Sequence, residues 1–144
     1  MPAPASPDHG RGKGYSLIEA VLAGALFALV ATIFIGAIAY GNESAALAGQ
    51  RARAAFIADE GLEIVRNMRD EDFANLVDGT YGLALTGDQW TFSGSQDTVG
   101  EFTREITITA VGAGTKTVAS TVTWQQNAQR TGTVSLETRM TAWR

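Results

Sequence analysis

Cysteine is absent from the 144 residues, and histidine occurs once, as His9 near the N-terminus. Without cysteine the chain can form neither disulfides nor thiolate metal sites. One imidazole so close to the N-terminus argues against a Ser-His-Asp triad and against a histidine-ligated metal. Lysine is scarce as well, because Lys116 is the only one beyond Lys13. No nucleophile–base pairing stands out. The sequence therefore predicts a non-enzyme without catalytic residues, cofactor, metal site or small-molecule substrate.

Basic residues are also few and scattered: there are 11 Lys and Arg against 15 Asp and Glu, with a net charge of −4 at pH 7. A nucleic-acid interface needs a basic face, so no nucleic-acid partner is expected. The length suits one modest domain with an additional segment.

A long apolar run is the most prominent feature that is present. The 21 residues from Ala20 to Tyr40 contain neither a charge nor a proline. A helix of that length spans roughly 30 Å, the thickness of a bilayer's hydrocarbon core. A buried core helix and a cleaved secretory signal peptide are the two alternatives. A signal peptide is cut after its apolar run, whereas here the candidate cut site, Gly14, precedes the run and follows Arg11 and Lys13.

The stretch KGYSLIEAVLAGALFAL, residues 13–29, resembles the class III signal of type IV pilin-like proteins, the family of pilus subunits and secretion pseudopilins. The resemblance implies that a prepilin peptidase removes a leader peptide, residues 1–14, by cutting after Gly14. It also implies methylation of the new terminal amine on Tyr15, where the family more commonly has Phe. The family's glutamate at the fifth mature position falls on Glu19. Gly36 stands near the position where major pilins often carry a helix-kinking proline, which favours a minor subunit.

Glu19 is the residue that requires a physical explanation. A carboxylate at the centre of a membrane helix costs about 2.5–3.5 kcal/mol on insertion scales and is usually functional. The resemblance implies that Glu19 is an assembly residue, which pairs with the Tyr15 amine of a neighbouring subunit. Removing both charges from water costs several kcal/mol per ion unless they meet, so such a pair would set the register of assembly. The alternative is a solvated residue at the membrane interface.

The resemblance and the two basic residues of the leader favour a cytoplasmic N-terminus. They predict a transmembrane helix over residues 15–41 in the cell (inner) membrane, crossing once. Arg51 and Arg53 lie beyond the far end of the run and make the charge rule alone ambiguous. Residues 42–144 are then expected outside the cytoplasm, as part of an extracytoplasmic filament after assembly.

Residues 42–70 continue the helical pattern without proline, as the amphipathic half of a spine helix that runs from Tyr15 to about Arg69. Gly41 and Gly49 are its weakest points, and an independent surface helix is the alternative. Apolar side chains recur at spacings of three, four or seven residues; they are Leu47, Ala54, Ile57, Ala58, Leu62, Val65 and Met68.

The helical pattern ends in an acidic stretch. Asp70 or Asp72 is expected to cap a short helical turn that ends near Val77, and Asp78-Gly79 to form a turn. The acidic cluster Asp70, Glu71, Asp72 and Asp78 could suggest calcium, but it lacks the order of a calcium-binding loop.

Residues 71–144 then read as a connecting loop followed by an antiparallel β-sheet. The segments TYGLAL and QWTFSG could form short strands in the loop, and EFTREITITA, KTVASTVTW and TVSLETRMTAW alternate as strands do. Gly112 to Gly114 and QQNAQRTG are expected to join these three strands. Each of them has one inward face, with Phe102, Arg104, Ile106 and Ile108 on the first, Val118, Ser120, Val122 and Trp124 on the second, and Val134, Leu136, Thr138 and Met140 on the third.

A sheet with one apolar face needs a cover, and residues 43–69 are the only sizeable candidate. The expected fold is α+β and pilin-like: a long N-terminal helix with a small antiparallel sheet packed on its C-terminal half. Trp124 and Trp143 are expected to pack in the core or at the sheet edge and not to act as sugar platforms. GAGTKT, residues 112–117, lacks the Gly-Lys pair of a phosphate loop and reads as a turn.

The sequence thus predicts a structural minor subunit of a type IV pilus-like filament. The alternatives are a pseudopilin of a type II secretion or DNA-uptake machine, and a membrane-tethered adhesin or binding module. The resemblance implies three partners: the prepilin peptidase, other pilin or pseudopilin subunits, and membrane lipid.

Overall fold

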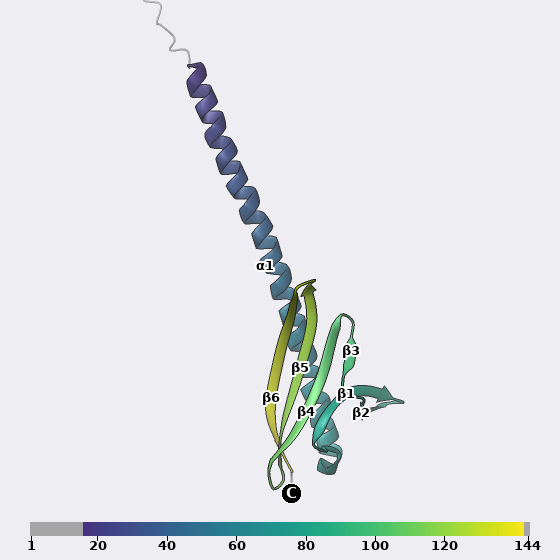
Figure 1. Ribbon diagram of the computed structural model, residues 1–144. Helices are drawn as coiled ribbons and strands as arrows, with labels where there is room; N and C mark the ends of the chain where they lie inside the picture. Colours follow the sequence, from purple (N-terminus) through teal and green to yellow (C-terminus); the bar gives the residue numbers. More distant parts are fainter. Residues whose placement is uncertain (1–15, 143–144) are drawn as a thin grey trace, which may run out of the picture. The chain divides into compact units, whose positions relative to one another are not determined.

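The computed structural model describes residues 16–142, which form one long helix and a small β-sheet. Helix α1 comprises Leu17–Glu71 (Figure 1), close to the bounds expected from the sequence. The chain divides into two compact units, residues 1–43 and residues 44–144. The described part of the first unit is the apolar portion of α1, preceded by Ser16. The second unit holds the rest of the helix and the whole sheet.

Within the second unit a short 3-10 helix, η1 (Phe73–Asn75), follows α1, and six strands complete the chain. The strands are β1 (Gly79–Thr86), β2 (Gln89–Ser93), β3 (Asp97–Val99), β4 (Phe102–Gly112), β5 (Thr115–Asn127) and β6 (Arg130–Thr141). All pairings are antiparallel, in the order β2-β1-β4-β5-β6. β3 and β1 share one edge of β4, where β3 pairs with residues 102–104 and β1 with residues 106–108.

The segments that the sequence placed in a connecting loop are strands of the sheet. TYGLAL belongs to β1, which pairs with β4, and QWTFS is β2, which pairs with β1. Gly87 begins the two-residue turn between them with φ +64°, a conformation that glycine adopts without steric cost. The hairpin at Gly112–Gly114 is confirmed. The β5–β6 connection is shorter than expected, because Asn127 already pairs with Arg130.

The core lies between the C-terminal half of α1 and the inner face of the sheet, as expected. It forms two clusters of buried side chains, of which one contains Leu62, Ile64, Val65, Met68, Leu76, Leu83, Ile106, Ile108, Val118 and Met140, and the other Ala54, Ala58, Phe102, Val122 and Trp124. The predicted alternation is confirmed on β4 and β5, where every inward position from Phe102 to Ile108 and from Val118 to Trp124 is buried. On α1 the sequence missed Ile64 and Gly61, which are also buried.

Gly61 lies where the helix and the sheet approach most closely. A Cβ atom at this position would be 2.7 Å from Ser120 Oγ, 3.0 Å from Arg104 Cδ and 3.1 Å from Ile106 Cδ1. Only a residue without a side chain fits there without displacing its neighbours. Ser120 Oγ is itself buried and has no hydrogen-bond partner among the described residues.

Candidate functional site

The start of α1 carries Glu19 in its first turn. The Ser16 carbonyl accepts hydrogen bonds from the amides of Glu19 (2.9 Å) and Ala20 (3.2 Å), so the helix is hydrogen-bonded from its first residues. An acid in the first turn is favoured by the helix dipole. Glu19 is the only charged residue from Ser16 to Asn42. The predicted cleavage and methylation residues, Gly14 and Tyr15, lie outside the described residues.

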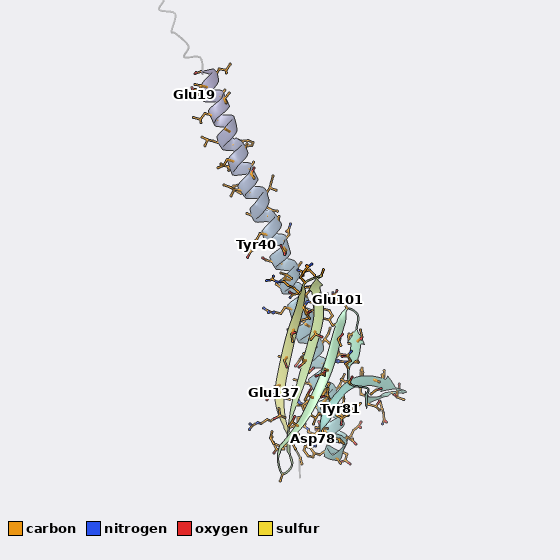
Figure 2. The ribbon with its side chains drawn as sticks, viewed as in Figure 1. Glu19, Tyr40, Asp78, Tyr81, Glu101 and Glu137 are labelled. Atoms are coloured by element: carbon orange, nitrogen blue, oxygen red, sulfur yellow. The ribbon has the colours of Figure 1, made fainter. Side chains whose placement is uncertain are left out.

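The apolar part of α1 has no cover within its own unit. Figure 2 shows side chains on all sides of this helix between Glu19 and Tyr40. Its large apolar side chains are exposed by 49% or more: Leu17, Ile18, Val21, Leu22, Leu26, Phe27, Leu29, Val30, Ile33, Phe34, Ile35, Ile38 and Tyr40. A helix that is apolar all round belongs in a core or a membrane. This one is long and apolar enough to cross a membrane.

The single hydroxyl in the middle of this stretch is satisfied inside the helix. Thr32 Oγ1 donates to the Ala28 carbonyl at 2.8 Å. Polar groups within a bilayer must be satisfied internally, because no water is available there. The threonine is therefore compatible with a lipid surrounding.

Most acids of the stretch 70–78 have partners in the structure. Asp70 accepts from Arg69 at 2.5 and 2.8 Å, and Asp72 Oδ1 accepts from the amide of Ala74 at 2.9 Å, which makes Asp72 the N-cap of η1. Of the two caps that the sequence proposed, the structure has Asp72. Among residues 16–142 no three acidic, histidine or cysteine side chains gather as a metal site would require.

Asp78 forms the contact between the η1–β1 connection and β5. Lys116 Nζ donates to Asp78 Oδ1 at 2.8 Å, and Tyr81 Oη donates to the Asp78 carbonyl at 3.1 Å. Asp78 and Tyr81 lie close together in Figure 2. The hydrogen bond from Lys116 lowers the pKa of the Asp78 carboxyl below its ordinary value of 3.8, and the charge of Lys116 adds to this.

A buried ion pair between Arg104 and Asp97 is the main polar feature of the core, and the sequence did not predict it. Arg104 is 2% exposed, with Nη2 2.8 Å and Nε 3.3 Å from the two Asp97 carboxylate oxygens. Arg104 Nη1 donates to the Ile57 carbonyl of α1 at 3.4 Å. Asp97 Oδ1 also accepts from the amide of Leu83 at 2.9 Å. The pair thus connects α1, β1, β3 and β4.

The sequence does contain one sign of a buried ion pair. Arg104 occupies an inward position of β4, and an inward arginine requires a buried acceptor. Sequence spacing alone did not identify Asp97 as that acceptor. The guanidinium donates to a carboxylate of β3 and to a backbone carbonyl of α1, which gives it a structural role in joining these elements.

Trp124 occupies the core, as predicted. It is 3% exposed, and its Nε1 donates to Gln50 Oε1 at 3.2 Å. Its ring lies 5.7 Å from that of Phe102, centroid to centroid, and it covers Gly132, where a Cβ atom would be 2.3 Å from the indole. Trp143 lies outside the described residues.

No family model, no curated protein and no solved structure matches this chain.

Proposed function

We propose that this chain is a structural minor subunit of a type IV pilus-like filament, held in the membrane by the apolar part of α1 and assembled through it. The observation that carries the proposal is the combination of an exposed apolar helix with a single carboxylate in its first turn. The same helix continues as the cover of a small sheet in the second unit. The motif around Gly14 and Tyr15 adds the processing that such a subunit requires.

A membrane anchor alone does not account for Glu19. An ordinary anchor gains only the helix-dipole contribution of about 0.3–1 kcal/mol from an acid in its first turn, and it inserts more easily without an ionisable group. A carboxylate at this depth is useful when a cation meets it, and the Tyr15 amine of a neighbouring subunit would supply that cation after cleavage. The pseudopilin alternative, in a secretion or DNA-uptake machine, uses the same helix and the same acid. Co-purification with either a pilus or a secretion apparatus separates the two.

The test compares Glu19→Ala, Glu19→Gln and the wild type at equal membrane levels. We expect Glu19→Ala to insert at least as well as the wild type and to be depleted from sheared or membrane-extracted filaments, because an incoming amine would have no partner. Glu19→Gln keeps size and hydrogen bonding without the charge, so an intermediate defect is expected. Wild-type incorporation of Glu19→Ala would show that Glu19 is a solvated interfacial residue.

The second unit supplies the control for that experiment. Glu19 belongs to the other compact unit, so the thermal unfolding of the sheet should be unchanged in both variants. A variant that lost the fold of the sheet as well could not be used to argue for a role in assembly.

A further inference from the structure

A surface hollow of about 280 Å³ lies where the end of α1, η1 and β2 meet. Met68 and Glu71 of α1, Asn75 of η1, and Gln89, Trp90 and Phe92 of β2 line it. Three elements thus contribute to one site, all from residues of the second unit.

The apolar part of the lining consists of two aromatic side chains and Met68, and it is continuous with the core. Trp90 and Phe92 point to the same side of β2, since side chains alternate along a strand. Phe92 is half-buried and stacks on Tyr81 with ring centroids 4.8 Å apart, whereas Trp90 is 37% exposed. Met68 is buried beside them. Phe92 thus packs against its neighbours, whereas the Trp90 indole is partly exposed to solvent.

The polar part of the lining has free hydrogen-bonding capacity. The Asn75 amide nitrogen donates to the Met68 carbonyl at 3.3 Å, which orients the side chain while its oxygen stays available. Within the described residues, the side chains of Glu71 and Gln89 have no hydrogen bond or ion pair. Glu71 differs in this from Asp70, Asp72 and Asp78, which all have partners.

An aromatic face beside one carboxylate and one oriented amide, that of Asn75, matches the chemistry of a sugar ring. The C–H face of such a ring packs on an aromatic side chain, and its hydroxyls donate to and accept from carboxylate and amide groups. The single carboxylate disfavours an anionic ligand. A quaternary ammonium would use the indole and the carboxylate but has no N–H or O–H group to pair with the Asn75 side chain.

We propose that this hollow binds one unit of a neutral saccharide, with Trp90 as the stacking platform and Glu71 and Asn75 as the hydroxyl-binding groups. Its volume lies just below the range of about 300–1,000 Å³ typical of pockets for drug-sized ligands, which suits a single ring. The proposal goes beyond filament assembly and does not depend on it, since the site and Glu19 lie in different units.

The experiment uses the full chain in micelles of a detergent without a sugar headgroup. The probes are glucose, galactose, mannose, N-acetylglucosamine and their disaccharides, with N-acetylneuraminic acid and tetramethylammonium as an anionic and a cationic comparison. Saturation-transfer NMR detects binding, and titration calorimetry gives the Kd. Three variants are compared with the wild type: Trp90→Ala, Glu71→Gln, and Phe56→Ala as a matched control. Phe56 is 76% exposed on α1 and does not line the hollow.

We expect at least one neutral saccharide to bind, with a Kd weakened about tenfold or more by Trp90→Ala and by Glu71→Gln, and unchanged by Phe56→Ala. The proposal is overturned if no neutral saccharide binds, if tetramethylammonium or the acidic sugar binds in preference, or if both site variants retain wild-type affinity. Glu71→Gln alters only a surface charge and keeps the test decisive should Trp90→Ala disturb the β1–β2 hairpin. Loss of filament incorporation in Glu19→Ala, with saccharide binding intact, would separate this site from the assembly function.

Discussion

Arg104 shows how a single charged residue is accommodated in the core of so small a sheet. Its guanidinium is surrounded by apolar neighbours but has a carboxylate, a backbone carbonyl and, at 3.8 Å, the carboxylate of Glu60 within reach. A buried charge is tolerated only when its partners remain in place. The residue that keeps Arg104 paired is Asp97, whose side chain is only 17% exposed.

We expect Asp97→Ala to lower the free energy of unfolding by roughly 3–5 kcal/mol, because it removes the only carboxylate that is hydrogen-bonded to the buried guanidinium among the described residues. Urea unfolding of the full chain in micelles, followed by tryptophan fluorescence, measures this. Glu101→Ala is the matched control, since Glu101 pairs with Arg53 at 3.8 Å on the surface and should cost about 1 kcal/mol or less. Equal losses of unfolding free energy in the two variants would show that the Arg104–Asp97 pair contributes no more to stability than the surface pair of Glu101 and Arg53.

The Asp78–Lys116 contact gives the stability a defined dependence on pH. The pKa of Asp78 is lowered in the folded chain, so its contribution is present above the unfolded value of about 3.9 and is lost as the pH falls through the folded value. We expect Lys116→Met to be less stable than the wild type at pH 7, with the difference shrinking on acidification below pH ~4. Thermal unfolding at a series of pH values tests this. A difference that stays constant down to pH ~2 would contradict the assignment.

At the scale of elements, the contact between α1 and the sheet depends on the absence of a side chain at Gly61. Glycine in a helix interior is less favourable than alanine by about 1 kcal/mol. The close contacts with Ser120, Arg104 and Ile106 explain why the helix keeps it. Helix propensity and packing therefore oppose each other at this position.

We expect Gly61→Ala to destabilise the second unit despite its better helix propensity, because the added methyl must displace Ser120 and the stem of Arg104. Gly49→Ala is the matched control, since a Cβ atom there has no neighbour within 4 Å. This substitution should raise the free energy of unfolding by up to about 1 kcal/mol, because alanine has the better helix propensity. Unfolding of both variants under the same conditions gives the comparison. Stabilisation by both substitutions would mean that the helix and sheet adjust freely at Gly61.

Periodicity allowed the elements themselves to be predicted. The inward residues of β4 and β5 alternate strictly, and the apolar positions on α1 follow the helical repeat, so their faces followed from the sequence. β1 and β2 were harder, because TYGLAL and QWTFS are short, so the sequence predicted them only as possible strands within a connecting loop and not as part of the sheet. The pairing of β1 with β4 is a tertiary contact that no local sequence pattern contains.

The candidate sites divide in a similar way. Glu19 was found because a charge within an apolar run is conspicuous in the sequence alone. The Arg104–Asp97 pair and the hollow beside Trp90 were missed, since both bring together residues from separate elements. Asp97 is seven residues from Arg104 and on another strand, and Met68 is more than twenty residues from Trp90.

At the scale of the whole molecule, the chain combines a helix that could cross a membrane with a unit that has its own core. The two parts place different demands on the sequence. An exposed apolar surface suits the helix if lipid covers it, whereas an apolar surface of that extent on the second unit would promote aggregation. If the proposed cleavage occurs, it removes the polar leader and keeps the apolar helix.

We expect the mature protein to begin at a methylated Tyr15, because the Lys-Gly-Tyr junction precedes the apolar run. Mass spectrometry of protein extracted from membranes measures the terminus directly. Gly14→Ala should accumulate the uncut form, since the resemblance implies a peptidase that accepts little beyond glycine. A mature terminus beyond Tyr40 would instead identify the run as a conventional signal peptide and refute the proposed function.

The buried arginine also has a consequence for how the strands find their alignment. Side chains alternate between the two faces of a strand, so sliding β4 by two residues along β5 leaves apolar side chains inside and polar ones outside. The burial of apolar side chains alone does not distinguish this shifted pairing from the native pairing. Asp97 lies opposite Arg104 in the β3–β4 pairing and would move with it. The slide would, however, carry Arg104 about 7 Å from the Ile57 carbonyl of α1, to which its guanidinium donates, and from the space that Gly61 leaves beside its Cδ. The contacts of Arg104 with α1 thus favour one alignment of β4 among those that the apolar residues accept equally.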